Sequence, residues 1–197
     1  METNKRRQER WLATRAALLD ATVETLVDDG YANTTMQRVQ ARAGVSRGSL
    51  THHFASMQEL LVAAVHHVAE GQLRELTKLV SGSNTPTDIG SLAGMLYRFM
   101  SGPLFAAGLE LWMAARTDPV LRQHLVPAER DLGRHLRSTL RENLSGPTGL
   151  RLERDDLETL LALLRGMAIT GVLREDGEAQ RALLTRWVAR VQNADHE

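Results

Sequence analysis

A short polar stretch, residues 47–53, carries side chains suited to hydrogen bonding rather than to core packing. Arg47 can donate two parallel hydrogen bonds to a guanine edge, and hydroxyl and imidazole groups can reach phosphates or bases. Gly48 has no side chain, so it would let the backbone of a bound partner approach closely. The residues concerned are Arg47, Gly48, Ser49, Thr51 and His53.

Helix-capping signals surround this polar stretch. Ser46 can cap the segment that follows it, and Gly44 separates that segment from a preceding one. Two capping boxes mark the helices on either side, Thr34 with Gln37 and Ser56 with Glu59. A short, polar, capped helix after a glycine turn is typical of a helix-turn-helix that enters the major groove of DNA. In such a motif the helix start at Thr35 offers free amides to phosphate, and Gln37 can reach the DNA backbone or a base edge.

Helical periodicity runs through almost the whole chain, and we find no alternating pattern that predicts a strand. We therefore predict an all-α protein of about nine helices. The first helix ends at Gly30, and the fourth runs from Ser56 to about Val80. The apolar face of the first helix is predicted to comprise Leu12, Ala16, Leu19, Val23 and Leu26.

Proline and glycine divide the rest of the chain. Pro86, Pro103 and Pro119 are predicted to occupy first helical positions. Pro127 either kinks its segment or opens a further helix. The firm breaks are residues 81–84 and 145–149, and the last two helices are expected at 155–174 and 178–193.

Composition excludes several classes of protein. The chain has no cysteine, so it has neither disulfides nor thiolate chemistry. Its net charge is zero, with a slight basic excess in residues 1–54 that suits a DNA-facing N-terminus. No secretory signal or apolar run of membrane-spanning length is present, so we expect a cytoplasmic protein without membrane contact.

Residues 34–60 resemble the helix-turn-helix of the TetR family of transcriptional regulators. The resemblance rests on Thr34-Thr35, Val39, Ala43-Gly44-Val45-Ser46, Gly48, Leu50, His53-Phe54 and Ser56, then Glu59-Leu60. It implies a DNA-binding domain over residues 12–72, with the helix-turn-helix at 35–54, and an effector-binding and dimerisation domain over 73–197. It also implies a homodimer that binds a palindromic double-stranded operator and responds to a small-molecule effector, most often as a repressor.

Three positions depart from the family pattern. Gln40 replaces the usual alanine, Thr51 replaces a phosphate-contacting tyrosine, and Met57 replaces a phosphate-contacting lysine. Arg47 and the basic segment Lys5-Arg6-Arg7 can compensate in part. Because phosphate contacts supply much of the affinity for DNA, we predict modest affinity with a shallow salt dependence.

Aromatic and methionine side chains concentrate between residues 95 and 113. They are either ordinary core or the wall of a pocket for an apolar or amphipathic effector. Arg98, Glu110 and Arg116 are possible polar groups there. The effector candidates are Met95, Phe99, Phe105, Trp112 and Met113.

The helix expected at 155–174 carries more apolar surface than one face requires, and the last helix has an apolar stripe of its own. Either both faces are buried within one subunit, or the two helices pair with those of a second chain in a four-helix interface, which we favour. The interface candidates are Leu157, Leu161, Leu164, Ala168, Val172, Trp187 and Val191.

Two other functions compete with that of a regulator. A helical dimer that lacks DNA binding is compatible with Thr51 and Met57. An all-helical metal-dependent enzyme would need a metal or nucleophile constellation. His66 and Glu70 have possible ligand spacing, but no third ligand follows. We therefore predict a protein that is not an enzyme and that uses no cofactor or metal.

Overall fold

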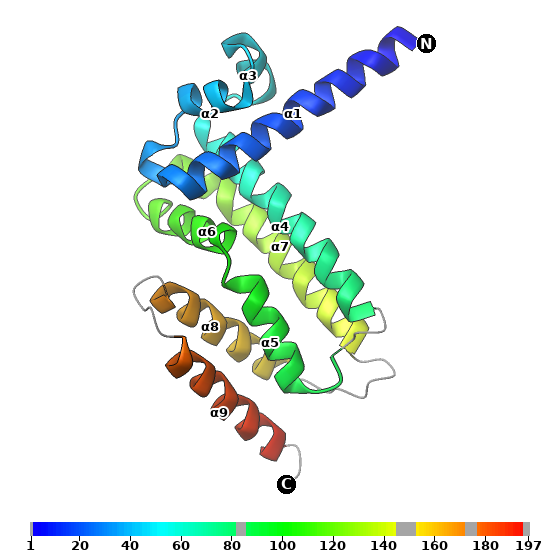
Figure 1. Cartoon of the computed structure of the whole chain (residues 1–197), viewed down its shortest axis with the longest axis vertical. Coiled ribbons are helices and arrows are strands. Elements are labelled where there is room, and N and C mark those ends of the chain that lie inside the picture. The colour runs from blue at the N-terminus through cyan, green and yellow to red at the C-terminus, as the bar shows by residue number, and fades with distance from the viewer. Residues whose placement is uncertain (1, 82–85, 145–152, 172–176, 195–197) are drawn as a thin grey trace. The chain divides into compact units, whose positions relative to one another are not determined.

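The computed structural model describes residues 2–81, 86–144, 153–171 and 177–194. Within these ranges the chain forms nine α-helices, one 3-10 turn and no strand, which confirms the predicted all-α class (Figure 1). Of the predicted break at 81–84, Ser81 is still the last residue of α4, and residues 82–84 lie outside the described residues, as does the predicted break at 145–149. The elements are α1 (Glu2–Asp29), η1 (Tyr31–Asn33), α2 (Met36–Ala43), α3 (Arg47–His53), α4 (Met57–Ser81), α5 (Ile89–Met100), α6 (Pro103–Ala114), α7 (Pro119–Leu144), α8 (Arg154–Gly171) and α9 (Glu178–Ala194).

The chain divides into two compact units. One comprises Met1–Gly71 with Ala107–Gly133, and the other comprises Gln72–Ala106 with Arg134–Glu197. Residues 107–133 therefore pack with the N-terminal helices. The functional division at residues 72 and 73 remains a prediction, because compactness does not show which part binds what.

The core of the N-terminal helices lies between the second half of α1 and the three helices that follow it. Leu18 and Leu19 of α1 are almost fully buried, with Val39, Leu50, Phe54 and Leu60 packed around them. The predicted apolar face was wrong for the first half of α1, since Leu12 is 53% exposed and Ala16 is also exposed. Helical spacing identifies a face, but it does not show how far the packing partners extend along it.

Two threonines take core positions that periodicity did not indicate. Thr22 and Thr25 of α1 are buried, and each hydroxyl donates to the carbonyl oxygen four residues earlier, at 2.6 Å in both cases. A buried hydroxyl needs such a partner, since leaving it unbonded costs about 1–3 kcal/mol. The helix backbone satisfies both groups locally.

The capping signals were confirmed at two helices and wrong at two. Ser46 caps α3 by accepting from the Ser49 amide, and Ser56 accepts from the Glu59 amide at the start of α4. At α2 the cap is Thr35, which accepts from the Arg38 amide, while the Thr34 hydroxyl donates to the Gly30 carbonyl. The other error concerns α5, where Asp88 is the cap and Pro86 precedes the helix.

The first halves of α4 and α7 pack together with part of α6. Their buried side chains include Leu61 and Val65 of α4, Leu111 of α6 and Leu121 of α7. Helix α7 continues through Pro127, so this proline does not open a new helix. Pro103 and Pro119 begin α6 and α7 as predicted.

In the other unit, α5, α8 and α9 pack on one another around a buried glutamine. Gln180 is 5% exposed, and its amide nitrogen donates to the Met167 carbonyl at 2.8 Å. Its amide oxygen accepts from the Tyr97 hydroxyl at 3.2 Å. Gln180 thereby joins all three helices. Among the described residues, no helix combines the length and the apolar character needed to cross a lipid bilayer.

Candidate nucleic-acid interface

The turn between α2 and α3 is made by a glycine in the left-handed region. Gly44 has φ 65° and ψ 28°, a conformation that costs other residues about 1–2 kcal/mol. The Val45 amide donates back to the Gln40 carbonyl at 3.4 Å, which closes α2 before Ser46 opens α3. Leu50, 1% exposed, anchors α3 in the core. These local features present the outer side of a seven-residue helix.

The residues predicted to contact DNA are largely exposed at this site. Thr35 and Gln37 are exposed at the start of α2, and Arg47, Gly48 and Thr51 are exposed on α3. Ser49 is half-buried. The predicted residues from Arg47 to His53 thus lie on one short helix, while their roles in DNA binding stay predictions.

The Thr51 hydroxyl faces its own helix. It lies 3.1 Å from the Arg47 carbonyl and 3.2 Å from the Gly48 carbonyl, so its single proton is donated to the main chain. A phosphate oxygen needs a donor, and Thr51 would have to give up these bonds to supply one. In this conformation the Thr51 hydroxyl offers no free proton to a phosphate, and its predicted role in DNA binding stays a prediction.

The His53 ring packs against aromatic neighbours instead of extending into solvent. Its ring centroid lies 4.9 Å from that of Trp11 and 6.4 Å from that of Phe54. Its Nδ1 atom is buried with no hydrogen-bond partner among the described residues. Burial, followed by the neighbouring His52 and Arg15, lowers the pKa of His53. The imidazole is therefore favoured in its neutral form.

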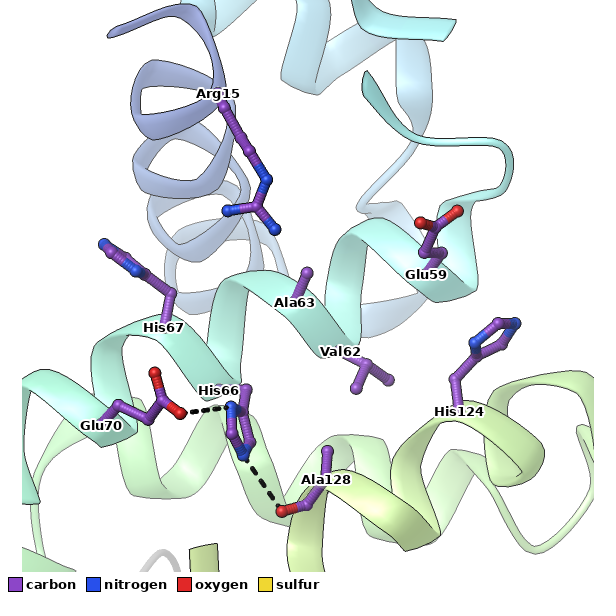
Figure 2. A pocket seen from close by; sticks show the side chains of 9 residues that line it. All are labelled: Arg15, Glu59, Val62, Ala63, His66, His67, Glu70, His124 and Ala128. Atoms are coloured by element: carbon purple, nitrogen blue, oxygen red, sulfur yellow. Dashed lines mark hydrogen bonds and ion pairs between the residues drawn. The ribbon is translucent and has the colours of Figure 1, made fainter. Parts of the chain in front are cut away.

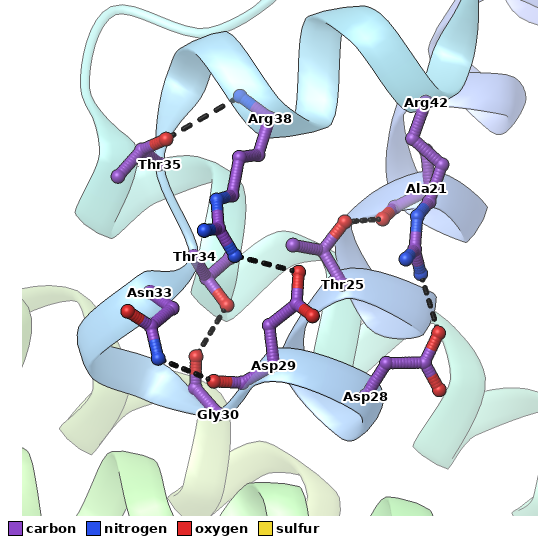
Figure 3. A network of polar contacts seen from close by, with 10 residues as sticks. All are labelled: Ala21, Thr25, Asp28, Asp29, Gly30, Asn33, Thr34, Thr35, Arg38 and Arg42. Atoms are coloured by element: carbon purple, nitrogen blue, oxygen red, sulfur yellow. Dashed lines mark hydrogen bonds and ion pairs between the residues drawn. The ribbon is translucent and has the colours of Figure 1, made fainter.

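Two arginines of α2 form ion pairs with the end of α1. Arg38 Nη1 lies 3.1 Å from Asp29 Oδ2, and Arg42 Nη1 lies 2.8 Å from Asp28 Oδ2 (Figure 3). These exposed pairs add little stability, but they neutralise two of the three arginines in α2 and α3. Sequence reasoning missed them, because their partners are brought together by the bend at Gly30 rather than by helical spacing.

A second polar junction ties the turn after α1 to α4, α6 and α7. The Tyr31 amide donates to Glu110 Oε2 at 2.7 Å, and the Tyr31 hydroxyl lies 3.4 Å from Asp118 Oδ2. Gln58 Nε2 donates to the same Asp118 oxygen at 3.2 Å, while Asp118 Oδ1 caps α7 through the Leu121 amide at 2.9 Å. These donors, the Leu121 amide foremost, lower the pKa of Asp118. Burial, with a contribution from Asp118, raises the pKa of Tyr31.

The Asp118 carboxylate is expected to make stability depend on pH. A carboxyl group with a lowered pKa stabilises the folded state above its ordinary pKa of 3.8, and that contribution is lost as the pH falls through the folded-state pKa. Asp118→Asn keeps a capping oxygen but has no charge, so wild type should be more stable than the variant at about pH 7. The difference should shrink below about pH 4. Urea unfolding at both pH values measures it, and an unchanged difference would contradict the assignment.

Known proteins similar to this chain are bacterial regulators. Residues 18–64 match the family described as "Bacterial regulatory proteins, tetR family". The HTH-type transcriptional regulator CymR of Pseudomonas putida is 32% identical over 186 residues, which cover 90% of this chain and 89% of CymR. The chain belongs to the TetR family. This membership confirms the predicted class of helix-turn-helix regulator and agrees with the prediction that the chain is not an enzyme.

A second regulator and a ligand-binding protein of known structure are also similar to this chain. An HTH-type transcriptional regulator of Mycobacterium tuberculosis is 36% identical over 121 residues, which cover 60% of this chain and 61% of that relative. The chain thus matches less than two thirds of that relative's length. The multidrug binding protein EbrR, solved in complex with ethidium, is 27% identical with a TM-score of 0.61, covering 89% of this chain and 98% of EbrR.

The predicted effector residues of this TetR-family chain do not all have the same environment. Met95 is 8% exposed, whereas Met113 is 68% exposed. Phe99, Phe105 and Trp112 are half-buried. Glu110, a possible polar group for the effector, accepts the Tyr31 amide. The effector site remains a prediction.

The predicted dimer residues lie on α8 and α9. Leu161, Leu164 and Val191 are buried, whereas Leu157, Ala168 and Trp187 are half-buried. Val172 lies outside the described residues. On the same two helices, Ile169 and Leu183 are 53% and 43% exposed. Apolar surface therefore remains available on both helices, and the dimer stays a prediction.

A cleft of about 330 Å³ lies among α1, α4 and α7, and none of the predicted effector residues lines it. Figure 2 shows Arg15, Glu59, Glu70 and three histidines around it, over Val62, Ala63 and Ala128. His66 Nδ1 lies 3.4 Å from Glu70 Oε1, and its Nε2 lies 3.1 Å from the Ala128 carbonyl oxygen. His66 therefore links α4 to α7. Among the described residues no group of three or more His, Asp or Glu side chains could hold a metal ion.

Proposed function

We propose that this chain is a cytoplasmic, ligand-responsive repressor that binds a palindromic DNA operator as a homodimer. The observation that carries the proposal is the exposed outer side of α3, which begins at a capped Arg47 and is anchored by Leu50. A helix of this kind fits the major groove, where the guanidinium can address a guanine edge. Membership of the TetR family supports the same interpretation.

The contacts with DNA would be divided among three segments. Arg47, Gly48 and Ser49 would approach base edges or the backbone, with Thr35 and Gln37 at the flank and the basic start of α1 on phosphates. His53 and Thr51 would contribute mainly by shaping α3, since both are engaged within the protein. The DNA-binding head, helices α1 to α4, would occur once in each chain of the dimer. The two heads would bind half-sites about 34–36 Å apart or a multiple of that distance.

The C-terminal helices would supply the dimer and the effector site. Ethidium bound to EbrR supports a small-molecule effector in this family, and the apolar surface on α8 and α9 supports pairing with a second chain. An effector can release DNA only by binding better to a state whose heads have the wrong spacing. The junction of Tyr31, Gln58, Glu110 and Asp118 offers a path along which a change in α6 or α7 could reach the DNA-binding helices. It joins these two helices to α4 and to the turn after α1 within one unit.

A titration of the purified dimer against DNA upstream of its own gene, at several salt concentrations, tests the proposal. We expect specific binding whose slope of log affinity against log salt is shallower than roughly −5, the value for about six phosphate contacts. The reason is that Met57 is packed against the core clusters and Thr51 donates internally, so neither anchors a phosphate. A steeper slope would contradict the predicted shortage of anchors.

The second candidate is a helical dimer that does not bind DNA. The same two residues favour it, since both usual phosphate anchors of the family are missing. A folded dimer that binds no upstream segment more tightly than unrelated DNA would support this candidate and overturn the regulator proposal.

A further inference from the structure

The first half of α1 extends beyond the buried core that α1 forms with α2, α3 and α4, yet its one aromatic side chain, Trp11, contacts the end of α3. Trp11 is 41% exposed, and its ring lies 4.9 Å from the His53 ring at an interplanar angle of 41°. Its neighbour Leu12 is 53% exposed. Trp11 is therefore a contact residue on a stretch of helix that is otherwise mostly exposed.

A second contact lies one helical turn further along α1. The Arg15 guanidinium carbon is 5.3 Å from the centroid of the Phe54 ring, a cation–π distance. Because residues four apart lie on the same side of a helix, Trp11 and Arg15 contact the adjacent rings of His53 and Phe54 together. Two turns of α1 thus hold the C-terminal end of α3.

The same helix carries exposed basic side chains immediately before Trp11. Lys5, Arg7 and Arg10 are exposed on α1. A stiff helix whose direction is fixed at Trp11 presents these charges in a constant position relative to α3, whereas an untethered helix end would spread them over many positions. Ordering costs conformational entropy, so a tether that is already in place before DNA binds raises affinity.

We infer that Trp11 is a positioning residue of the DNA-binding surface, which holds His53 and thereby aligns the basic start of α1 with the recognition helix α3. The inference rests on the proposed function. The ligand of the combined surface is the phosphate backbone flanking the groove that α3 enters. Trp11 itself acts through His53, and its indole need not touch DNA.

Three variants test this inference by fluorescence anisotropy with the operator. Trp11→Ala should weaken binding about tenfold, the upper range for an aromatic pair, and should reduce the salt slope by about 0.9 for each phosphate that is no longer neutralised. Trp11→Phe retains a ring and should restore most of the affinity. Leu12→Ala removes an exposed apolar side chain from the adjacent position and should bind like wild type. Thermal unfolding of each variant identifies any loss of fold.

An NMR titration of the histidines tests the contact between Trp11 and His53 itself. In Trp11→Ala the His53 ring becomes hydrated, so the pKa of His53 should rise toward its ordinary value of 6.5. The His53 resonance is identified by its absence in His53→Gln. If wild type binds the operator while Trp11→Ala leaves the affinity and the salt slope unchanged, the inference alone is overturned, whatever the His53 titration shows. Failure of the wild type to bind DNA would overturn the proposed function and the inference with it.

Discussion

Arg47→Ala is expected to weaken operator binding roughly 5- to 150-fold, equivalent to about 1–3 kcal/mol for the bidentate hydrogen bonds to one base. Arg47 is the first residue of α3 and is exposed, and no ion pair holds its guanidinium within the described part of the chain. The substitution should therefore leave the free energy of unfolding nearly unchanged. Anisotropy titrations with the operator and with unrelated DNA measure the loss of affinity.

Arg47→Lys is the matched control, because it keeps the charge but loses the planar fork that addresses two guanine acceptors. The lysine variant should retain non-specific affinity and salt dependence while losing discrimination against a substituted base pair. Equal losses of specific and non-specific affinity in both variants would show that Arg47 binds phosphate instead, and would contradict its assignment as a base reader.

Phe54→Ala is expected to lower the free energy of unfolding by about 3–5 kcal/mol, the usual cost of deleting a fully buried aromatic ring. Phe54 is 2% exposed and packs among Leu18, Leu19 and Leu50, which belong to α1 and α3. Its ring also contacts the Arg15 guanidinium. Its removal should therefore loosen the attachment of α3 to α1, and operator binding should fall with stability. Chemical denaturation followed by circular dichroism measures the change.

Val27→Ala provides the comparison for Phe54. Val27 lies on the same helix as Leu18 and is 41% exposed, so its truncation should change the free energy of unfolding by less than about 0.5 kcal/mol. If the two variants lost similar stability, the head would not be held together by the cluster around Phe54.

Charge in the helix-turn-helix is distributed differently from what its composition indicates. Arg38 and Arg42 are paired with Asp29 and Asp28, so much of their charge is balanced before DNA approaches. We therefore expect Arg47 and the basic start of α1 to supply much of the attraction for phosphate. This distribution accords with the predicted shallow salt dependence and makes the alignment of α1 with α3 important for affinity.

The helices and the polar stretch of α3 could be predicted from short-range patterns. Ser46, Ser56 and Gly44 act on amides and carbonyls within about four residues, so the same bonds form wherever these residues precede or end a helix. The bounds of α3, the proline starts of α6 and α7, and the family resemblance all depend on such local signals. One-residue errors, as at Thr34 and Thr35, arise because adjacent threonines can both serve as caps.

Contacts between distant segments could not be predicted in this way. The pairing of Trp11 with His53, of Arg38 with Asp29 and of Tyr31 with Glu110 depends on how the chain bends at Gly30 and on which buried side chains fit together. Periodicity specifies the face that a helix buries, whereas the extent and identity of its partner follow from packing. Leu12 and Ala16 are exposed for this reason, because the buried cluster begins only further along the helix, at Leu18.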